Sequence, residues 1–194
     1  MNDTVISRQP VAVADIVAEA EALSFNMMSE AKVGALLAVL AASKPGGHLL
    51  ELGTGTGHGT AWLLSGVDAT ATLDSVDTDE AVVAVARRHL GADHRVTFHV
   101  TDGAVFLSKE GLRPFDLIYA DAWPGKFSHL DKALSLLRPG GVYVIDDLLP
   151  QTNWPEGHAP KVPVLIDHIE GRSDFSSVRL AWAAGLILVV RRAG

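Results

Sequence analysis

The chain has 194 residues, 48% of them hydrophobic, which suits one domain with a single buried core. Its formal net charge of −7 and the lack of a lysine or arginine stripe argue against a nucleic-acid-binding surface. It has no cysteine, so disulfides and thiolate metal sites are excluded. No apolar stretch approaches the roughly 18 residues of a membrane helix, and the N-terminus lacks a signal-peptide pattern. We expect a cytoplasmic protein that binds neither nucleic acid nor membrane.

The predicted elements alternate between helices and strands along most of the chain. Two helices are expected first, at about 11–23 and 29–42, the second with Ser29 as its N-cap. An apolar strand follows and ends at Leu52, and a helix begins after the glycines that come next. Later elements are expected at about 73–77 (strand), 79–90 (helix), 95–100 (strand), 104–109 (helix), 116–120 (strand), 128–137 (helix) and 142–145 (strand). This alternation predicts βαβ units and five parallel strands.

The C-terminal end breaks the alternation. Two strands, 177–182 and 186–191, are separated by three residues, which forces an antiparallel hairpin. The predicted fold is therefore α/β: a Rossmann-like, seven-stranded mixed sheet with helices on both faces. We expect residues 1–194 to form one domain, in which the helices within 1–45 cover the ligand site.

A glycine-rich turn follows the first strand. Gly53, Gly55 and Gly57 alternate there, so the backbone can approach a ligand without Cβ atoms in the way. The dinucleotide fingerprint needs a third glycine where His58 stands, which disfavours a nicotinamide site. The pattern Glu51-x-Gly-x-Gly-x-Gly resembles the cofactor loop of class I methyltransferases that depend on S-adenosylmethionine (SAM).

Acidic residues end the neighbouring strands, where ligands of open α/β sheets bind. Asp77 is placed to bind both ribose hydroxyls, and a helix-capping role is the alternative. Asp102 is placed to accept the adenine amino group or to cap the next helix. Glu51 is expected beneath the turn, tying down its amides or facing the methionine part of SAM. The predicted cofactor contacts are Glu51, Gly53, Thr54, Gly55, Gly57, His58, Asp77, Thr78, Asp102, Gly103 and Asp121.

Three carboxylates follow the fourth and fifth strands. Asp121 ends one strand, and Asp146 and Asp147 end the next, so all three are expected on one rim. Clustered carboxylates repel one another unless a cation lies among them, and Mg²⁺ prefers such oxygen ligands. A bound divalent ion would hold a hydroxyl substrate and lower its pKa.

The segments Y-A-D-A-W-P-G-K (119–126) and V-I-D-D (144–147) resemble the catechol and caffeoyl-CoA O-methyltransferase family. The resemblance implies Asp121, Asp146 and Asp147 as metal ligands and Lys126 as the catalytic base. Two departures leave alternatives open. Asp147 stands where the family has Asn, so the carboxylates could instead act as bases without a metal. Lys126 lies further past Asp121 than in the family, and could simply be a solvated loop lysine that pairs with it.

Residues 148–160 are rich in proline and glycine and are expected to form a lid. Trp154 and His158 are candidates for one wall of an acceptor pocket, with Trp123 opposite. The sequence thus predicts methyl transfer from SAM, giving S-adenosylhomocysteine (SAH), to a hydroxyl of a small acceptor, with Asp121 and Lys126 as catalytic residues. The rival interpretations are a non-catalytic SAM-binding module and an NAD(P)-type oxidoreductase. A homodimer is suggested by the family resemblance alone.

Overall fold

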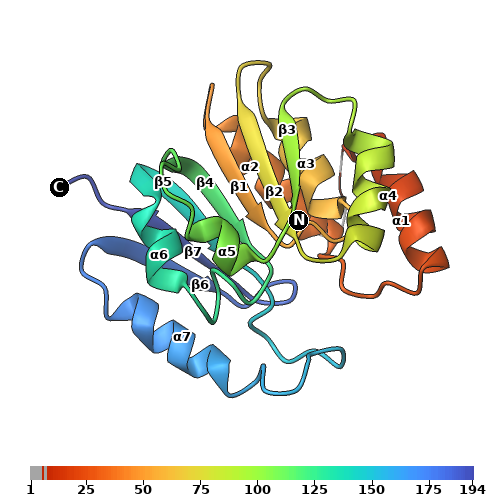
Figure 1. Ribbon diagram of the computed structural model, residues 1–194. Helices are drawn as coiled ribbons and strands as arrows, with labels where there is room; N and C mark the ends of the chain where they lie inside the picture. Colours follow the sequence, from red (N-terminus) through yellow and green to blue (C-terminus); the bar gives the residue numbers. More distant parts are fainter. Residues whose placement is uncertain (1–5, 7) are drawn as a thin grey trace.

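A computed structural model describes residue 6 and residues 8–194. Its centre is one seven-stranded sheet with the order β3-β2-β1-β4-β5-β7-β6 (Figure 1). The strands are β1 (His48–Leu52), β2 (Thr72–Asp77), β3 (Val96–Val100), β4 (Phe115–Ala120), β5 (Leu137–Ile145), β6 (Phe175–Leu180) and β7 (Leu186–Arg191). The first five are parallel, and β7 pairs antiparallel with both β5 and β6. The predicted mixed sheet and terminal hairpin are confirmed.

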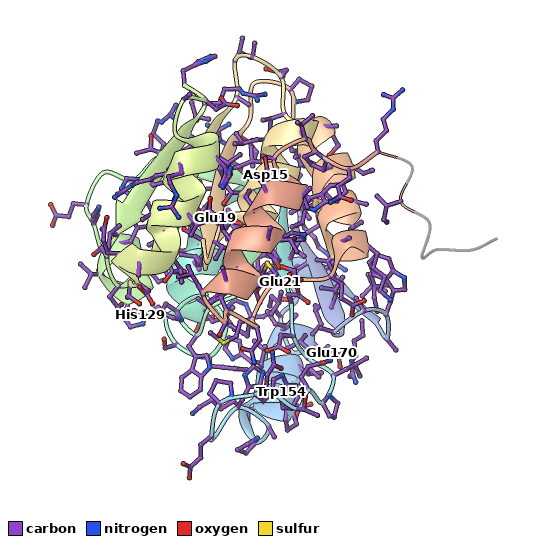
Figure 2. The ribbon with its side chains drawn as sticks, turned by 90° about the vertical axis from the view of Figure 1, so that its right-hand side faces the viewer. Asp15, Glu19, Glu21, His129, Trp154 and Glu170 are labelled. Carbon is purple, nitrogen blue, oxygen red and sulfur yellow. The ribbon has the colours of Figure 1, made fainter. Side chains whose placement is uncertain are left out.

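Helices cover both faces of the sheet. One apolar core contains side chains of α1 (Val13–Ala22), α2 (Ala31–Ala42), α3 (His58–Gly66) and α4 (Glu80–Leu90). The other contains side chains of α5 (Gly103–Leu107), α6 (Leu130–Ser135) and α7 (Lys161–Glu170). Figure 2 shows α1 from outside, with Glu19 directed towards α4, where the Nε2 atom of His89 lies 2.7 Å from its carboxylate. Burial on both faces fits the three leucines among the five buried residues of β1.

Three local predictions need correction. Glu30, not Ser29, is the residue before α2, and its side chain makes no capping hydrogen bond. Ser29 does not cap the helix, because its hydroxyl is bonded to Tyr119. Strand β5 begins at Leu137, so it runs through Gly140 and Gly141, which were expected to lie before the strand. Helix α7 was not predicted, although its buried Val162, Leu165 and Ile169 recur at helical spacing.

The strand order places β1 and β4 side by side at the centre of the sheet, where the connections diverge to the two edges. In open α/β sheets a ligand binds outside the carboxyl ends of the strands at such a switch point. The glycine turn after β1 and Asp121 after β4 both lie there, since the Asp121 amide donates to the Leu52 carbonyl at 2.9 Å. In the part of the chain that the structure describes, no helix is long and apolar enough to cross a membrane.

Candidate active site

Two adjoining cavities lie at the carboxyl ends of the central strands. The larger has a volume of about 490 Å³ and the smaller about 240 Å³. Both are lined by Gly53, Asp77, Thr78, Ala122 and Trp123. Their position at the switch point and their shared wall make them one candidate ligand site.

The glycine turn has the backbone that the spacing predicted. Gly53, Gly55 and Gly57 all have positive φ, at 106°, 51° and 94°, a region that favours glycine. A Cβ atom on Gly57 would lie 2.8 Å from the Cβ of Ala86 in α4. The turn therefore lets α3 begin close to α4. Thr54, also expected to contact the cofactor, lines the cavity while its hydroxyl lies 2.6 Å from that of Ser75.

Asp77 joins the glycine turn to the end of β2. Its Oδ2 accepts from the Gly55 amide at 2.8 Å, and its Oδ1 accepts from the Asp79 amide at 3.1 Å. The helix-capping role falls to Asp79, which accepts from the Ala81 amide at 2.8 Å. Asp77 is thus free of that role and borders both cavities.

Asp102 caps a helix and also lines the smaller cavity. Its Oδ1 accepts from the amides of Ala104 at 2.6 Å and Val105 at 3.3 Å. Asp102 and Gly103 lie on the wall of that cavity together with Asp77 and Thr78. The two interpretations of Asp102 are compatible, because a carboxylate has further lone pairs for a ligand.

Glu51 is fully buried beneath the turn. Its Oε2 accepts from the hydroxyls of Thr60 at 2.5 Å and Ser75 at 2.6 Å. Its Oε1 has no partner in the structure, and a Cβ atom on Gly59 would come within 2.5 Å of it. Burial raises the pKa of Glu51 to about 8. A cationic ligand group beside Glu51 would stabilise the ionised form of this buried carboxyl.

His58 begins α3 and lines the larger cavity. Burial lowers its pKa to about 4, so the imidazole is neutral at pH 7. The indole N–H of Trp62 is 3.4 Å from Nε2, which makes Nε2 an acceptor. The ring proton is then on Nδ1, a buried donor that has no partner in the structure.

The carboxylates after β4 and β5 meet around a buried tyrosine. The Tyr119 hydroxyl lies 2.8 Å from Asp146 Oδ2, 3.3 Å from Asp121 Oδ2 and 2.8 Å from the Ser29 hydroxyl. Burial, with the neighbouring charge of Asp146, raises the pKa of Asp121 to about 7. Burial also raises the pKa of Asp146 and holds that of Tyr119 well above its usual value. Tyr119 was not among the predicted site residues, although it lies two residues before Asp121, and Ser29 was predicted as a helix cap within the N-terminal part that covers the ligand.

Lys126 is buried at 2% exposure, in contrast to the loop lysine that was one alternative. Its Nζ lies 3.7 Å from Asp121 Oδ1. Gly125, with φ of 88°, turns the chain inwards, and the Tyr143 hydroxyl donates to its carbonyl at 2.7 Å. This tight turn makes up for the longer sequence separation between Lys126 and Asp121.

Asp147 points towards the segment 148–160, which was expected to form a lid. Its φ is 65°, and its Oδ1 accepts from the Trp154 indole N–H at 2.5 Å. The Nε2–H of His158 donates to the Asp147 carbonyl at 3.0 Å, and the imidazole stacks on Trp154 with ring centres 4.3 Å apart. His158 and Trp123 line the larger cavity as expected. Trp154 is a correction: among the described residues it stacks on His158 and lines neither cavity.

The carboxylates do not fit the metal site that the resemblance implies. Within residues 6 and 8–194, no three or more His, Asp or Glu side chains are arranged to hold a metal ion. Asp147 is turned to Trp154, and the ammonium of Lys126 faces Asp121. The arrangement can instead hold a substrate hydroxyl beside a carboxylate and an ammonium.

Known proteins resemble this chain in sequence and in fold. A catechol O-methyltransferase from Niastella koreensis is 33% identical over 121 residues, which cover 59% of this chain and 53% of that protein. The crystal structure of the O-methyltransferase TomG from Streptomyces achromogenes, in complex with SAM, superposes with a TM-score of 0.82 at 23% identity, covering 98% of this chain and 94% of TomG. An O-methyltransferase from Bacillus cereus in complex with SAH gives 0.85 at 20% identity, covering 97% and 94%.

The chain spans about half the length of several curated relatives that it matches. The likeness to the solved structures establishes the fold. Residues 50–148, about half of the chain, match a family model described as a methyltransferase domain. This segment runs from β1 to the residue after Asp147, so it contains the glycine turn and the carboxylate rim. The chain belongs to the methyltransferase domain family.

Proposed function

We propose that this protein transfers the methyl group of SAM to a hydroxyl group of a small molecule. One observation carries the proposal: among the described residues, the buried side-chain nitrogen and oxygen atoms that lack a hydrogen-bond partner all belong to residues lining the larger cavity. They are Glu51 Oε1, Thr56 Oγ1, His58 Nδ1 and His158 Nδ1. Buried polar groups are costly without partners, so a polar ligand is the expected occupant.

The amino-acid end of SAM suits the pair Glu51 and His58. Glu51 Oε1 has no partner and, once the carboxyl has given up its proton, would accept from the ligand's ammonium group; the Nδ1–H of His58 is an unpaired donor for the ligand's carboxylate. Asp77 would accept from the ribose hydroxyls, and Asp102 in the smaller cavity from the adenine amino group. The two joined cavities suit this long, jointed ligand.

Asp121 is the residue we propose as the base. It borders the larger cavity with Lys126, and a raised pKa of about 7 suits proton acceptance near neutral pH. When bound, SAM supplies an electrophilic methyl group on a sulfonium that leaves without activation. The protein therefore has to align the acceptor oxygen and take its proton. Lys126, in an ion pair with Asp121, is the second catalytic residue of the proposal.

The acceptor is proposed to be small and aromatic. The larger cavity must hold both the methionine part of SAM and the acceptor, which limits the acceptor's size. His158 and Trp123 offer ring surfaces on its wall, and the Niastella koreensis relative is named for an aromatic diol. The proposed setting is cytoplasmic, with a homodimer as the oligomeric state and no nucleic-acid partner.

The proposal treats residues 1–194 as one domain whose N-terminal part covers the ligand. The segment between α1 and α2 supports this, because Phe25, Met27, Met28, Ser29 and Glu30 line the larger cavity. The ring of Phe25 also lies against the glycine turn, where a Cβ on Gly55 would be 3.1 Å from it.

The test is calorimetric titration of SAH into the full chain, with NADH as the comparison ligand. We expect micromolar SAH binding and none for NADH. Asp77→Ala should abolish most of the SAH heat. Asp68→Ala is a matched control, because Asp68 also accepts from backbone amides but lies outside the described cavities. Absence of SAH binding would refute the proposal, and SAH binding without turnover on any hydroxyl acceptor would favour a non-catalytic module.

A further inference from the structure

The three carboxylates beyond β4 and β5 already have polar or charged neighbours within the protein. Asp121 faces Lys126 Nζ through Oδ1 at 3.7 Å and the Tyr119 hydroxyl through Oδ2 at 3.3 Å. Asp146 accepts from the Asp147 amide through Oδ1 at 2.7 Å and from Tyr119 through Oδ2 at 2.8 Å. Asp147 accepts from Trp154 through Oδ1, and its Oδ2 lies 3.6 Å from His158 Nε2. The nearest polar neighbours of these carboxylates are therefore groups of the chain itself, with the single Tyr119 hydrogen shared between Asp121 and Asp146.

The backbone turn before Lys126 fixes the position of this side chain. A Cβ atom on Gly125 would lie 2.4 Å from Leu52 and 2.8 Å from the Tyr143 hydroxyl, so only glycine allows so tight a turn. The Gly125 amide also donates to the Ser128 carbonyl at 2.7 Å. A buried ammonium is retained only with an anionic partner, and Asp121 is that partner.

Tyr119 has an equally fixed place. It belongs to β4 and is buried at 1% exposure, and its hydroxyl lies between the carboxylates of Asp121 and Asp146. Ser29 completes its hydrogen bonding from the segment before α2. The hydroxyl thus occupies the space between the two carboxylates that a bridging ion would need.

A divalent ion could bind here only by breaking these contacts. Mg²⁺ requires oxygen ligands at about 2.0–2.1 Å in near-octahedral geometry. Asp147 would have to leave Trp154, and Lys126 would be left buried beside a second cation. Removing the partner of a buried charge is strongly destabilising.

We propose that Lys126 and Tyr119 take the place of a divalent metal ion in this site, so that its methyl transfer is independent of metal. The inference rests on the proposed methyltransferase function and specifies its catalytic cation. Lys126, in its ion pair with Asp121, faces the acceptor oxygen. As that oxygen bonds to the methyl carbon, the carbon–sulfur bond breaks and its electron pair goes to sulfur. The hydroxyl proton goes to the Asp121 carboxylate.

The first test is Mn²⁺ binding to the full chain, measured by electron paramagnetic resonance up to about 1 mM, a range that covers weak protein sites. We expect no stoichiometric site in the wild type. Lys126→Met should bind Mn²⁺ at least tenfold more tightly, because the charge that occupies the cation's place is gone. Lys132→Met, at an exposed lysine of α6, should behave like the wild type. A wild-type site that Asp121→Asn removes, or a Lys126→Met variant with unchanged affinity, would overturn the proposal.

The second test uses turnover. Activity after treatment with EDTA should equal activity with added Mg²⁺, and tenfold stimulation by the metal would refute the inference. Lys126→Met should lower kcat by at least a hundredfold, with Lys126→Arg recovering a part because it restores the cation. Equal kcat in the Met and Arg variants would contradict the role of the charge. SAH titration distinguishes failure of the proposed function from failure of this inference. If SAH does not bind, the methyltransferase function is refuted. The Mn²⁺ experiment still tests whether Lys126 and Tyr119 occupy the place of a metal ion.

Discussion

The two sides of the cavity are constructed differently. The glycine-turn side, residues 51–58 with Asp77, is held by backbone amides of neighbouring strands, such as the Gly53 amide bonded to the Val76 carbonyl at 2.9 Å. The carboxylate side, residues 119–126 and 146–158, is held by side chains that come together from distant segments. Ser29 reaches Tyr119 across 90 positions of sequence. Backbone geometry thus forms the side we assign to the cofactor, and side-chain chemistry forms the side we assign to the acceptor.

The largest expected effect separates catalysis from binding. Asp121→Asn keeps the side-chain size but removes the proposed proton acceptor, so kcat should fall by about 10²–10⁴-fold. SAH affinity should be unchanged. Asp77→Ala should do the reverse, weakening SAH binding by about 1.5–3 kcal/mol, the usual worth of a hydrogen bond to a charged group. Calorimetry and a methyl-transfer assay measure the two quantities, and equal changes in both variants would undo the division.

The next effect tests the backbone of the glycine turn. Gly57→Ala places a Cβ 2.8 Å from that of Ala86 and keeps a positive φ, so we expect a loss of about 2–5 kcal/mol from strain and overpacking together. Gly111→Ala is the matched control, because Gly111 also has positive φ, at 75°, but no atom within 4 Å of the added Cβ. Urea unfolding measures both. Losses of the same size would mean that close packing against α4 adds nothing.

A pH experiment examines the buried acid beneath the turn. The folded-state pKa of Glu51 is about 8, against 4.5 when unperturbed, so the folded chain binds an extra proton between these values. Its contribution to stability is complete below pH 4.5 and is lost as the pH rises through 8. Glu51→Gln cannot titrate, so without ligand its free energy of unfolding should fall less steeply over this range, by up to about 5 kcal/mol. Parallel pH profiles of melting temperature for the two proteins would contradict the raised pKa.

The same contrast explains what the sequence could predict. The order of the strands and the glycine turn follow from local patterns, and the structure agrees with them apart from the start of β5. Tyr119 and Ser29 could not be predicted as partners, because their contact depends on where α2 packs relative to β4. The burial of Lys126 likewise depends on Leu52 and Tyr143 enclosing Gly125. Residue types and strand ends gave the acidic rim, whereas the direction of each carboxylate was set by contacts distant in sequence.

The smallest expected effect concerns the one hydrogen bond between the lid and the N-terminal segment that we expect to matter for ligand release. The Asn153 side chain donates to the Asn26 carbonyl at 2.9 Å. Asn153→Ala removes an exposed hydrogen bond of about 0.5–1.5 kcal/mol, so SAH should dissociate severalfold faster with kcat unchanged. Asn26→Ala is the control, because the acceptor is a backbone carbonyl that this substitution leaves in place. Stopped-flow dissociation of SAH measures both variants. If both variants speed SAH release equally, the effect cannot be assigned to the Asn153–Asn26 hydrogen bond alone. If neither variant speeds release, residues 148–160 and the N-terminal segment open independently of this hydrogen bond.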